Sequence, residues 1–314
     1  MNEFLKDVWE GLTAPSKSLN SKYFYDEEGD RIFREIMDCP EYYLTKCELE
    51  IFVNQSKNIA KSINGNLADF DLVELGPGDC TKSEYLLREL LVTQKHFTYY
   101  PIDISENIIN QINTSLPHRV PGIKIQGLNG DYMAMLEISN QLSSKNKVVL
   151  FLGSSIGNFP LAENPAFFRH LRQYLRPGDL LITGFDLKKD SGIILNAYND
   201  DAGITKRFNL NLFKRINNTL GANFDLNKFE HHTFYDPKSG ACKSYLESKI
   251  EQSVRIGSMG NIHFAKHEFI YMEISQKYTL EDTLSIANNS GFTPIGEFYD
   301  SKKWFLDAMW RNNE

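Results

Sequence analysis

The sequence predicts an α/β protein in which a doubly wound parallel sheet is joined to a second, α+β domain. From about residue 68, short apolar runs alternate with helical patterns, a rhythm typical of βαβ units with helices on both faces of the sheet. Between about residues 200 and 275 the pattern changes to one helix followed by alternating, strand-like residues. We therefore assign 61–199 and 276–314 to the sheet domain, and 1–60 and 200–275 to the second domain.

The elements of the sheet domain follow in order along the chain. A buried strand over 71–76 precedes a helix over 82–91, and a strand over 97–104 precedes a helix that Ser105 can cap. Further strands are expected at 123–128, 148–153 and 180–185, with a helix around Phe167, Phe168 and Leu171. The C-terminal part resumes the pattern, with a helix in TLEDTLSIANNSGF and an antiparallel edge pair formed by TPIGEFYD and KKWFLDAMW.

Composition excludes several classes of function. The 314 residues carry a net charge of −7 without a basic stripe, so no nucleic-acid partner is expected. Charges interrupt the N-terminal apolar residues, which predict a short amphipathic helix, and no apolar run approaches the ~20 residues of a membrane span. We expect a cytoplasmic protein that does not enter a membrane.

Cysteine and histidine spacing gives no metal motif. The four cysteines contain no C-x-x-C pair, so neither a disulfide nor a structural zinc site is expected. A metal pair at His263 and His267, or at His231 and His232, would lack the carboxylate ligands of a recognisable motif. We therefore expect no bound metal.

A glycine turn, Glu74-Leu75-Gly76-Pro77-Gly78-Asp79-Cys80, follows the first strand. Glycines there let the backbone approach a ligand closely, and the next helix offers N–H groups at its start. A dinucleotide fold would place a third glycine at Thr81, whereas acid-x-Gly-x-Gly is typical of S-adenosylmethionine (SAM)-dependent methyltransferases. The sequence therefore predicts SAM as the cofactor, with Gly76 and Gly78 in its site.

Acidic residues follow the next two strands. Asp103 ends the second strand, where a carboxylate can accept both ribose hydroxyls. Asp131 and Tyr132 follow the third strand, where they can hydrogen-bond the adenine amine and stack on its ring. Three such positions at successive strand ends favour a nucleotide-like cofactor over unrelated surface residues.

A second turn, Gly153-Ser154-Ser155-Ile156-Gly157, matches the G-x-S-x-G nucleophile elbow of serine hydrolases. As a hydrolase the chain would use Ser155, with Asp186 or Asp200 as the acid and His231 as the base, in the required chain order. That alternative leaves the glycine turn and Asp103 without a role. We expect the serines to be turn residues.

Motifs spread over nearly the whole chain carry a family resemblance. They are KYFYDEEGDRIFREI, PEYYLTKCE, VELGPGD, FLGSSIGNFP, FDLKKD, AYNDDAGITKRFNLNLFKRINNTLGANFDLNKFEH and YMEISQKY. Together they resemble the histidine-specific N-alpha-methyltransferases, which form hercynine for ergothioneine biosynthesis, and a relative, the fungal 4-dimethylallyltryptophan N-methyltransferase. The resemblance implies a monomer with a Rossmann-like class I methyltransferase core and a substrate-binding domain. It also implies that S-adenosylhomocysteine (SAH) is the product formed from the cofactor.

The resemblance also implies roles for individual residues. Tyr25 and Tyr42 should face the substrate, and Asn158 and Tyr198 should hold the amino-acid carboxylate. Glu273 and Ser275 should read the imidazole, and Gly76, Lys82, Asp103 and Asp131 should contact the cofactor. The family's histidine enzymes often carry a methionine near Ser244, in a strand that shapes the ring pocket.

The chemistry adds Tyr25 and Asn158 as catalytic candidates. Methyl transfer to an amine is an in-line displacement that requires an unprotonated nitrogen and good alignment. Tyr25 is expected to orient the amine, since a phenol with a pKa of about 10 is a poor base at neutral pH. Asn158 can lie near the amine as a neutral group.

Two further functions remain open from the sequence. Another amino acid, such as tryptophan or a derivative, is the main alternative substrate. Glu273 and Ser275, two apart on an expected strand, favour imidazole because indole offers one donor and no acceptor. A cofactor-binding relative without turnover is the other alternative, which the retained candidate residues disfavour.

Overall fold

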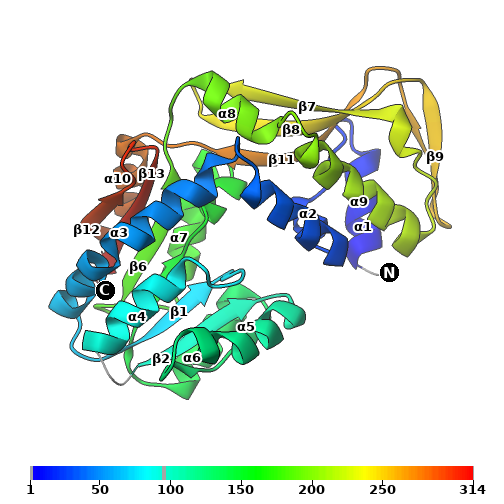
Figure 1. Cartoon of the computed structure of the whole chain (residues 1–314). Coiled ribbons are helices and arrows are strands. Elements are labelled where there is room, and N and C mark those ends of the chain that lie inside the picture. Colours follow the sequence, from blue (N-terminus) through cyan, green and yellow to red (C-terminus); the bar gives the residue numbers. More distant parts are fainter. Residues whose placement is uncertain (1–2, 94–96, 314) are drawn as a thin grey trace. The chain divides into compact units, whose positions relative to one another are not determined.

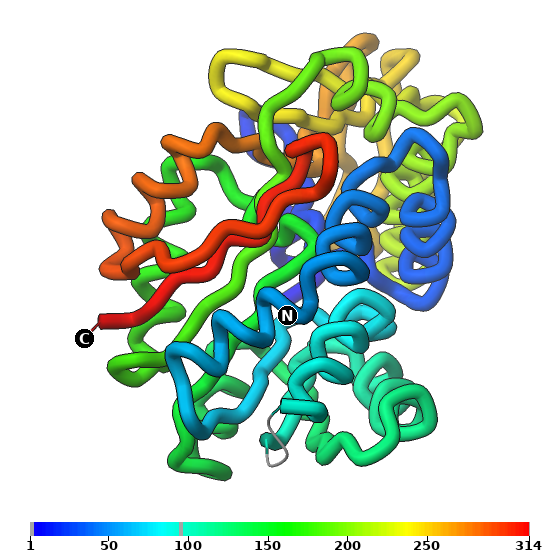
Figure 2. The backbone as a smooth tube through the Cα atoms, turned by 60° about the vertical axis from the view of Figure 1, so that its left-hand side comes forward, coloured from blue at the N-terminus to red at the C-terminus, as the bar shows by residue number. Residues whose placement is uncertain are grey.

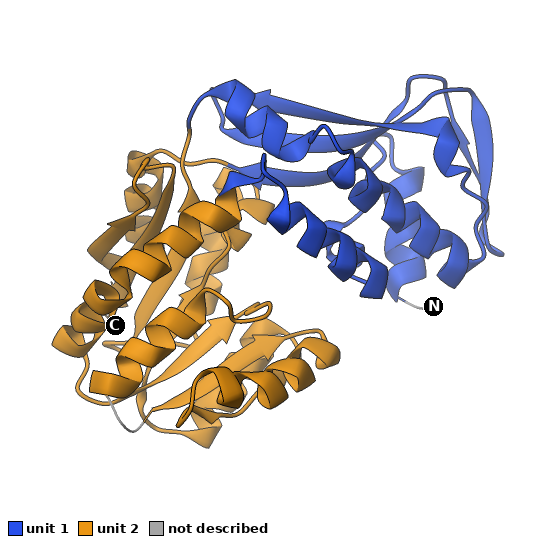
Figure 3. Ribbon diagram, in the orientation of Figure 1, with its two compact units in different colours: residues 1–43, 189–276 blue, residues 44–188, 277–314 orange. Residues whose placement is uncertain are grey.

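The structure is a computed structural model that describes residues 3–93 and 97–313. The chain forms two compact units, unit 1 (1–43 and 189–276) and unit 2 (44–188 and 277–314), coloured separately in Figure 3. The unit boundaries differ from the predicted 60/61 and 199/200. Helix α3 (Tyr43–Asn66) runs without a break, so unit 2 begins near its first residue. Helix α8 (Ser191–Tyr198) packs on strand β7 (Phe229–Asp236) and so belongs to unit 1.

Unit 2 contains the predicted doubly wound sheet (Figure 1). Its strands are β1 (Phe70–Leu75), β2 (Thr98–Asp103), β3 (Lys124–Ile125), β4 (Leu128–Asn129), β5 (Asn146–Phe151), β6 (Leu180–Asp186), β12 (Phe292–Tyr299) and β13 (Phe305–Asn312). The strand order is β12-β13-β6-β5-β1-β2-β3, with β4 also paired to β2. The strands from β1 to β6 pair in parallel, whereas β13 is antiparallel to both β6 and β12, beside which it lies in Figure 2. The α/β fold and the antiparallel edge pair are confirmed.

The helices of unit 2 cover the sheet. They are α3, α4 (Ser83–Thr93), α5 (Glu106–Arg119), α6 (Tyr132–Leu142), α7 (Asn164–Arg172) and α10 (Leu280–Asn289), with short 3-10 helices η2 (Ser155–Asn158) and η3 (Leu161–Glu163). One face of the sheet shares a buried apolar core with α6, α7 and α10, in which Phe168 packs edge-on against Trp310. The predicted cap of α5 is present, since the Ser105 hydroxyl accepts from the Ile108 N–H at 3.3 Å.

The predicted third strand is wrong in its length. Residues 123–128 form two short strands, β3 and β4, which both pair with β2. Between them, the N–H of Gln126 donates to the Tyr99 carbonyl at 2.9 Å. A Cβ at Gly127 would lie 2.6 Å from the Ile109 side chain, so α5 approaches the chain here too closely for a regular strand residue with a side chain.

Unit 1 is a small α+β unit. Its helices are α1 (Glu3–Thr13), η1 (Ser21–Phe24), α2 (Glu27–Asp38), α8, α9 (Ile204–Leu220) and η4 (Leu226–Lys228). Its strands are β7, β8 (Ala241–Ser248), β9 (Gln252–Ile256), β10 (Gly260–Phe264) and β11 (Phe269–Gln276). They form an antiparallel sheet in the order β11-β8-β7 and a separate β9–β10 hairpin. The predicted amphipathic helix is α1, which buries Phe4, Val8 and Leu12.

Residues 3–93 and 97–313 contain no candidate membrane-spanning helix. None of the helices described there combines the length and the apolar composition that crossing a bilayer requires.

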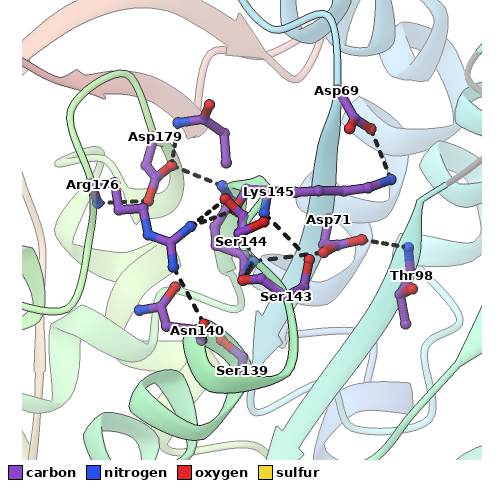
Figure 4. Close-up of polar contacts among 12 residues, drawn as sticks. Asp69, Asp71, Thr98, Ser139, Asn140, Ser143, Ser144, Lys145, Arg176 and Asp179 are labelled. Atoms are coloured by element: carbon purple, nitrogen blue, oxygen red, sulfur yellow. Dashed lines mark hydrogen bonds and ion pairs between the residues drawn. The ribbon is translucent and has the colours of Figure 1, made fainter.

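A polar network ties together the amino ends of strands β1, β5 and β6 in unit 2 (Figure 4). The Asp179 carboxylate accepts from the backbone N–H groups of Lys147 (2.8 Å) and Arg176 (2.7 Å), and from the side chain of Asn146 (2.8 Å). The ammonium of Lys147 is buried, and it donates to the carbonyl oxygens of two residues in the preceding turn. Because these buried groups satisfy one another, the network fixes the amino edge of the sheet.

Replacing Asp179 by Ala is expected to lower the free energy of unfolding by roughly 2–4 kcal/mol, because it leaves buried N–H groups without acceptors. The matched control is Asp69→Ala, which breaks the surface ion pair with Lys145 at 2.8 Å and should cost less than about 1 kcal/mol. Urea titrations of both variants measure the difference. Equal losses in the two variants would contradict this account of the network.

Candidate active site

The glycine turn after β1 has backbone geometry that glycine adopts readily. Gly76 and Gly78 have positive φ values of 67° and 57°. A Cβ at Gly76 would lie 2.7 Å from the hydroxyl oxygen of Tyr132, whereas one at Gly78 would have no described atom within 4 Å. Gly76 therefore serves both the conformation of the turn and the close approach of Tyr132.

Asp103 lies beside this turn at the carboxyl end of β2. The Gly76 N–H donates to the carbonyl of Ile102 at 2.9 Å, which ties the turn to the residue before Asp103. One Asp103 carboxylate oxygen accepts from the Ser105 N–H at 2.8 Å, and burial raises the pKa of this carboxyl. Unit 2 thus brings Gly76, Asp103 and Tyr132 together, as the sequence predicted for a nucleotide-like ligand.

Asp131 and Tyr132 start helix α6 at the same edge of the sheet. The Asp131 carboxylate caps the helix by accepting from the N–H groups of Met133 (2.9 Å) and Ala134 (3.3 Å) through Oδ1. The Tyr132 ring packs edge-on against Phe151, with 6.1 Å between ring centroids. Burial raises the pKa of Tyr132, so its hydroxyl stays protonated at neutral pH.

Glu74, the acid of the predicted acid-x-Gly-x-Gly turn, is buried, and the sequence analysis gave it no role of its own. It accepts from the Tyr99 hydroxyl at 2.5 Å, and the Cys80 thiol lies 3.2 Å from the same hydroxyl. Burial raises the pKa of Glu74 to about 7. The hydrogen bond from Tyr99 acts in the opposite direction and is the smaller effect.

The titration of Glu74 predicts a pH-dependent stability. Between its ordinary pKa of 4.5 and about 7 the folded state binds more protons than the unfolded chain, so stability falls as pH rises through this window. The expected loss is on the order of 3 kcal/mol, and Glu74→Gln should remove this part of the slope. Urea unfolding of both proteins across the window measures it. Parallel stability curves for the two proteins would contradict the assignment.

The GSSIG turn follows β5 and serves its neighbours structurally. The Ser155 hydroxyl donates to the carbonyl of Leu152 in its own turn at 2.8 Å. Ser154, with φ 55°, is left-handed like Gly153 (φ 73°), and its hydroxyl accepts from the Asp186 N–H at 3.1 Å. Asn158 ends the short helix η2 that follows, with an exposed side chain.

The proposed hydrolase acids already have structural partners. Asp186 forms a fully buried ion pair with Lys277 at 2.7 Å. Asp200 accepts from the N–H groups of Ile204 (2.7 Å) and Thr205 (2.8 Å) at the start of α9. Burial lowers the pKa of His231 to about 4. The structure therefore gives Ser155 a turn role and offers no support for the hydrolase alternative.

A β-bulge in β11 of unit 1 determines where Glu273 points. Tyr271 pairs with Tyr245 on β8, whereas Glu273 pairs with the next residue along, Ser244, so Met272 is the extra residue. The bulge reverses the alternation of side chains, which places Glu273 and Ser275 on the face opposite to Tyr245. The predicted shared face of Glu273 and Ser275 is confirmed by this pairing.

Tyr198, Ser275 and Tyr42 meet in unit 1. The hydroxyl groups of Tyr198 and Ser275 lie 2.6 Å apart in a hydrogen bond. The Tyr42 ring packs edge-on against the Tyr198 ring, with 5.9 Å between centroids. The Tyr198 carbonyl accepts from the Thr233 hydroxyl at 2.8 Å, which fixes the end of α8 to β7. Unit 1 thus gathers three predicted substrate residues around one hydroxyl pair.

Comparison with known proteins decides the family. The profile of a family described as histidine-specific, SAM-dependent methyltransferases matches residues 4–312. The chain belongs to this family. It is 33% identical over 301 residues to histidine N-alpha-methyltransferase of Mycolicibacterium smegmatis, covering 93% of this chain and 92% of that protein. The corresponding Mycobacterium tuberculosis protein is 32% identical, with 87% and 84% covered. Ergothioneine biosynthesis protein 1 of Schizosaccharomyces pombe is 29% identical over 89% of this chain, but over only 37% of that protein.

Membership of this methyltransferase family confirms the prediction of a SAM-dependent enzyme. The glycine cradle fits the cofactor, because the absence of a side chain at Gly76 leaves backbone accessible between Tyr132 and the end of β2. Within residues 3–93 and 97–313, no cluster of three His, Cys, Asp or Glu side chains is arranged to hold a metal ion.

Asn209 is a residue of this methyltransferase that the sequence analysis missed. It lies on α9, is fully buried, and donates from Nδ2 to Glu273 Oε1 at 3.0 Å and to the Thr205 carbonyl at 3.1 Å. The amide therefore holds the Glu273 carboxylate toward α9. A buried Asn in an amphipathic helix was the available signal, because a buried polar side chain requires a partner.

Tyr25 belongs to an aromatic group of unit 1. It follows η1, is exposed, and packs edge-on against Phe33 of α2 (5.6 Å) and Phe208 of α9 (5.7 Å). Its predicted role toward the substrate stays a prediction, as does that of Asn158 in unit 2.

Proposed function

We propose that this methyltransferase transfers methyl groups from SAM to the α-amine of free L-histidine, giving the trimethyl betaine hercynine for ergothioneine biosynthesis. The observation that carries the proposal is the Glu273–Ser275 pair, fixed by Asn209 on one side and Tyr198 on the other. The similarity to histidine N-alpha-methyltransferases supports the same substrate.

In this proposal Glu273 and Ser275 each form a hydrogen bond with one of the two ring nitrogens of the substrate. A phenol is more acidic than an alcohol, so Tyr198 is the natural donor to Ser275, whose own hydrogen can then be donated to the basic imidazole nitrogen. The Glu273 carboxylate accepts from the other ring N–H. A site built on such pairs rejects rings that cannot satisfy both groups.

The cofactor would be held in unit 2 by the glycine turn, Lys82, Asp103, Asp131 and Tyr132. When bound, SAM supplies a methyl group activated by its positively charged sulfur. The contribution of the chain is to bind and align, which is worth roughly 7–11 kcal/mol in well-oriented reactions.

The substrate amine must lose a proton before each transfer. We propose that Tyr25 and Asn158 orient this amine, and that Tyr42 and Tyr198 face the amino-acid substrate. Asn158 is also proposed to hold its carboxylate. The same role for Tyr198 stays a prediction, and it requires the single hydroxyl hydrogen of Tyr198 to turn from Ser275 to the carboxylate. Aromatic rings such as Tyr25 can favour the cationic, methylated amine as it grows.

Tryptophan is the second candidate substrate, because Ser244 pairs directly with Glu273 across the strands and is a small residue at that place. A small side chain leaves volume for a larger ring. A relative named L-tryptophan methyltransferase, from Psilocybe serbica, is 27% identical over 98% of this chain. The Glu273–Ser275 pair favours histidine, because imidazole offers both a donor and an acceptor.

The test is incubation of the purified protein with SAM and histidine, followed by mass spectrometry of the product over time. We expect species with one, two and three added methyl groups, all located on the α-nitrogen by fragmentation. Methylation of the ring, or no methylated histidine, would overturn the proposal. A monomeric state and a cytoplasmic location stay predictions.

Asn209→Ala is expected to raise the Michaelis constant for histidine roughly tenfold, because Glu273 loses the donor that orients it. The constant for SAM should stay unchanged. The matched control is Asn217→Ala on the same helix, which breaks the bonds between the Asn217 amide and the Phe224 backbone and should leave both constants unchanged. Steady-state kinetics measure the split. A shift in the SAM constant alone would contradict the role given to Asn209.

A further inference from the structure

A buried carboxylate joins two loops at the cofactor edge of the sheet. Glu48 on α3 is almost fully buried, and its Oε1 accepts from the backbone N–H of Gly153 at 2.7 Å. Its Oε2 forms an ion pair with the ammonium of Lys82. Lys82 belongs to the loop after β1 and Gly153 to the loop after β5. One side chain therefore bridges the two loops that flank the middle of the sheet.

The sheet leaves room for this carboxylate. A Cβ at Gly184 of β6 would lie 2.5 Å from Glu48 Oε1, so a side chain at this position would displace the carboxylate. A Cβ at Gly153 would lie 3.8 Å from the Lys82 nitrogen, which places the ammonium over the loop after β5. Gly184 therefore leaves the space that the Glu48 carboxylate occupies.

A second buried carboxyl stands beside the first. Asp307 of β13 pairs in register with Gly184 and is fully buried. Neither of its carboxyl oxygens has a hydrogen-bond donor within the described part of the chain. Burial, and then the neighbouring Glu48 carboxylate, hold the pKa of Asp307 well above its usual range. A buried carboxyl without a donor favours its protonated form, and that proton can bridge Asp307 to Glu48.

The ion pair of this cluster is the one between Glu48 and Lys82. Although burial alone would lower the pKa of Lys82, the Glu48 carboxylate beside it holds that pKa above its usual value. Lys82 keeps about a quarter of its side-chain surface exposed, so part of this side chain is accessible while its ammonium is held by Glu48.

We propose that Glu48 is a positioning residue of the cofactor site, which fixes the Lys82 ammonium and the Gly153 loop for the carboxylate end of SAM, with Asp307 as its neutral hydrogen-bond donor. The proposal rests on the proposed cofactor role of Lys82. Glu48 touches neither cofactor nor substrate, and acts through Lys82 and the Gly153 N–H.

Glu48→Gln and Asp307→Asn each replace a carboxyl group by an amide of similar size, so they change the charge at these positions with little change in side-chain shape. The amide of Asp307→Asn keeps a neutral donor, so SAH affinity should change less than about threefold, since the charge-assisted pair is retained. In Glu48→Gln, Asp307 can ionise in place of Glu48, but it lies on another strand, so SAH affinity should fall roughly tenfold. In the double variant Lys82 loses both carboxylates of this cluster, and the loss of SAH affinity should reach roughly a hundredfold.

Isothermal titration with SAH and steady-state kinetics test the series, with Glu137→Gln on the exposed face of α6 as the charge control. The Michaelis constant for SAM should rise least in Asp307→Asn, more in Glu48→Gln and most in the double variant. The Michaelis constant for histidine should stay constant. Wild-type affinity in the double variant, or an Asp307→Asn loss as large as that of Glu48→Gln, would overturn the proposal. Failure of the wild type to bind SAH or to methylate histidine would instead overturn the proposed function.

Discussion

Glu273→Gln is expected to lower kcat/KM for histidine roughly a hundredfold, about 3 kcal/mol, because a charged acceptor for the ring N–H is lost. Most of the change should appear in the Michaelis constant for histidine. The constant for SAM should stay within the error of the wild-type value, since Glu273 belongs to unit 1 and the proposed cofactor residues belong to unit 2. Steady-state kinetics with each substrate varied in turn measure this split.

The matched control is Glu247→Gln on the neighbouring strand β8. Glu247 pairs with Phe269 of β11 and contacts His232 and His267 at 2.5 Å each. It lies on the opposite face of the same sheet from Glu273, because the bulge separates the two registers. We expect unchanged constants in this variant. Equal histidine constants for wild type and Glu273→Gln would end the assignment of Glu273 to the imidazole.

Gly76→Ala is expected to abolish measurable SAH binding at concentrations that saturate the wild type. A side chain at φ 67° costs about 1–2 kcal/mol, and the added Cβ would lie 2.7 Å from the Tyr132 hydroxyl. Either the turn or Tyr132 must move, and both are proposed cofactor contacts. Isothermal titration with SAH measures the loss, and circular dichroism checks that the fold is retained.

Gly78→Ala separates the two causes, since it imposes similar backbone strain at φ 57° with no described atom within 4 Å of the new Cβ. It should weaken SAH binding less than Gly76→Ala. Tyr132→Phe, introduced into the Gly76→Ala protein, removes the hydroxyl that the Cβ meets and should restore part of the affinity. If Gly78→Ala is the more damaging variant, close approach of Tyr132 is not the reason for glycine at position 76.

Much of the fold of unit 2 could be predicted because its strands are buried on both faces and are separated by amphipathic helices. The same reasoning overextended the third strand, since the contact of Gly127 with α5 is a tertiary effect that leaves no mark on hydropathy. It also split α3 between two domains. A helix that continues across a unit boundary has no local signal at that boundary.

The candidate site was predictable only in part. Gly76, Asp103 and Tyr132 follow from the topology of a parallel sheet, which brings strand ends together. The shared face of Glu273 and Ser275 follows from strand alternation, but the face on which they lie depends on the bulge at Met272. Glu48 did have a signal in the sequence, because it is a charged residue among the buried positions Leu44, Ile51 and Phe52 of a helix. The role of that charge can be inferred only from the structure, which places Lys82 and Asp307 beside it.

The most direct test of the histidine assignment is a competition in one tube, with equal concentrations of histidine and tryptophan and limiting SAM. Mass spectrometry measures the ratio of the two methylated products, which equals the ratio of the two kcat/KM values at equal concentrations. The Glu273–Ser275 pair predicts that methylated histidine predominates by at least about a hundredfold. An excess of methylated tryptophan would contradict the account and would assign this site to the larger ring.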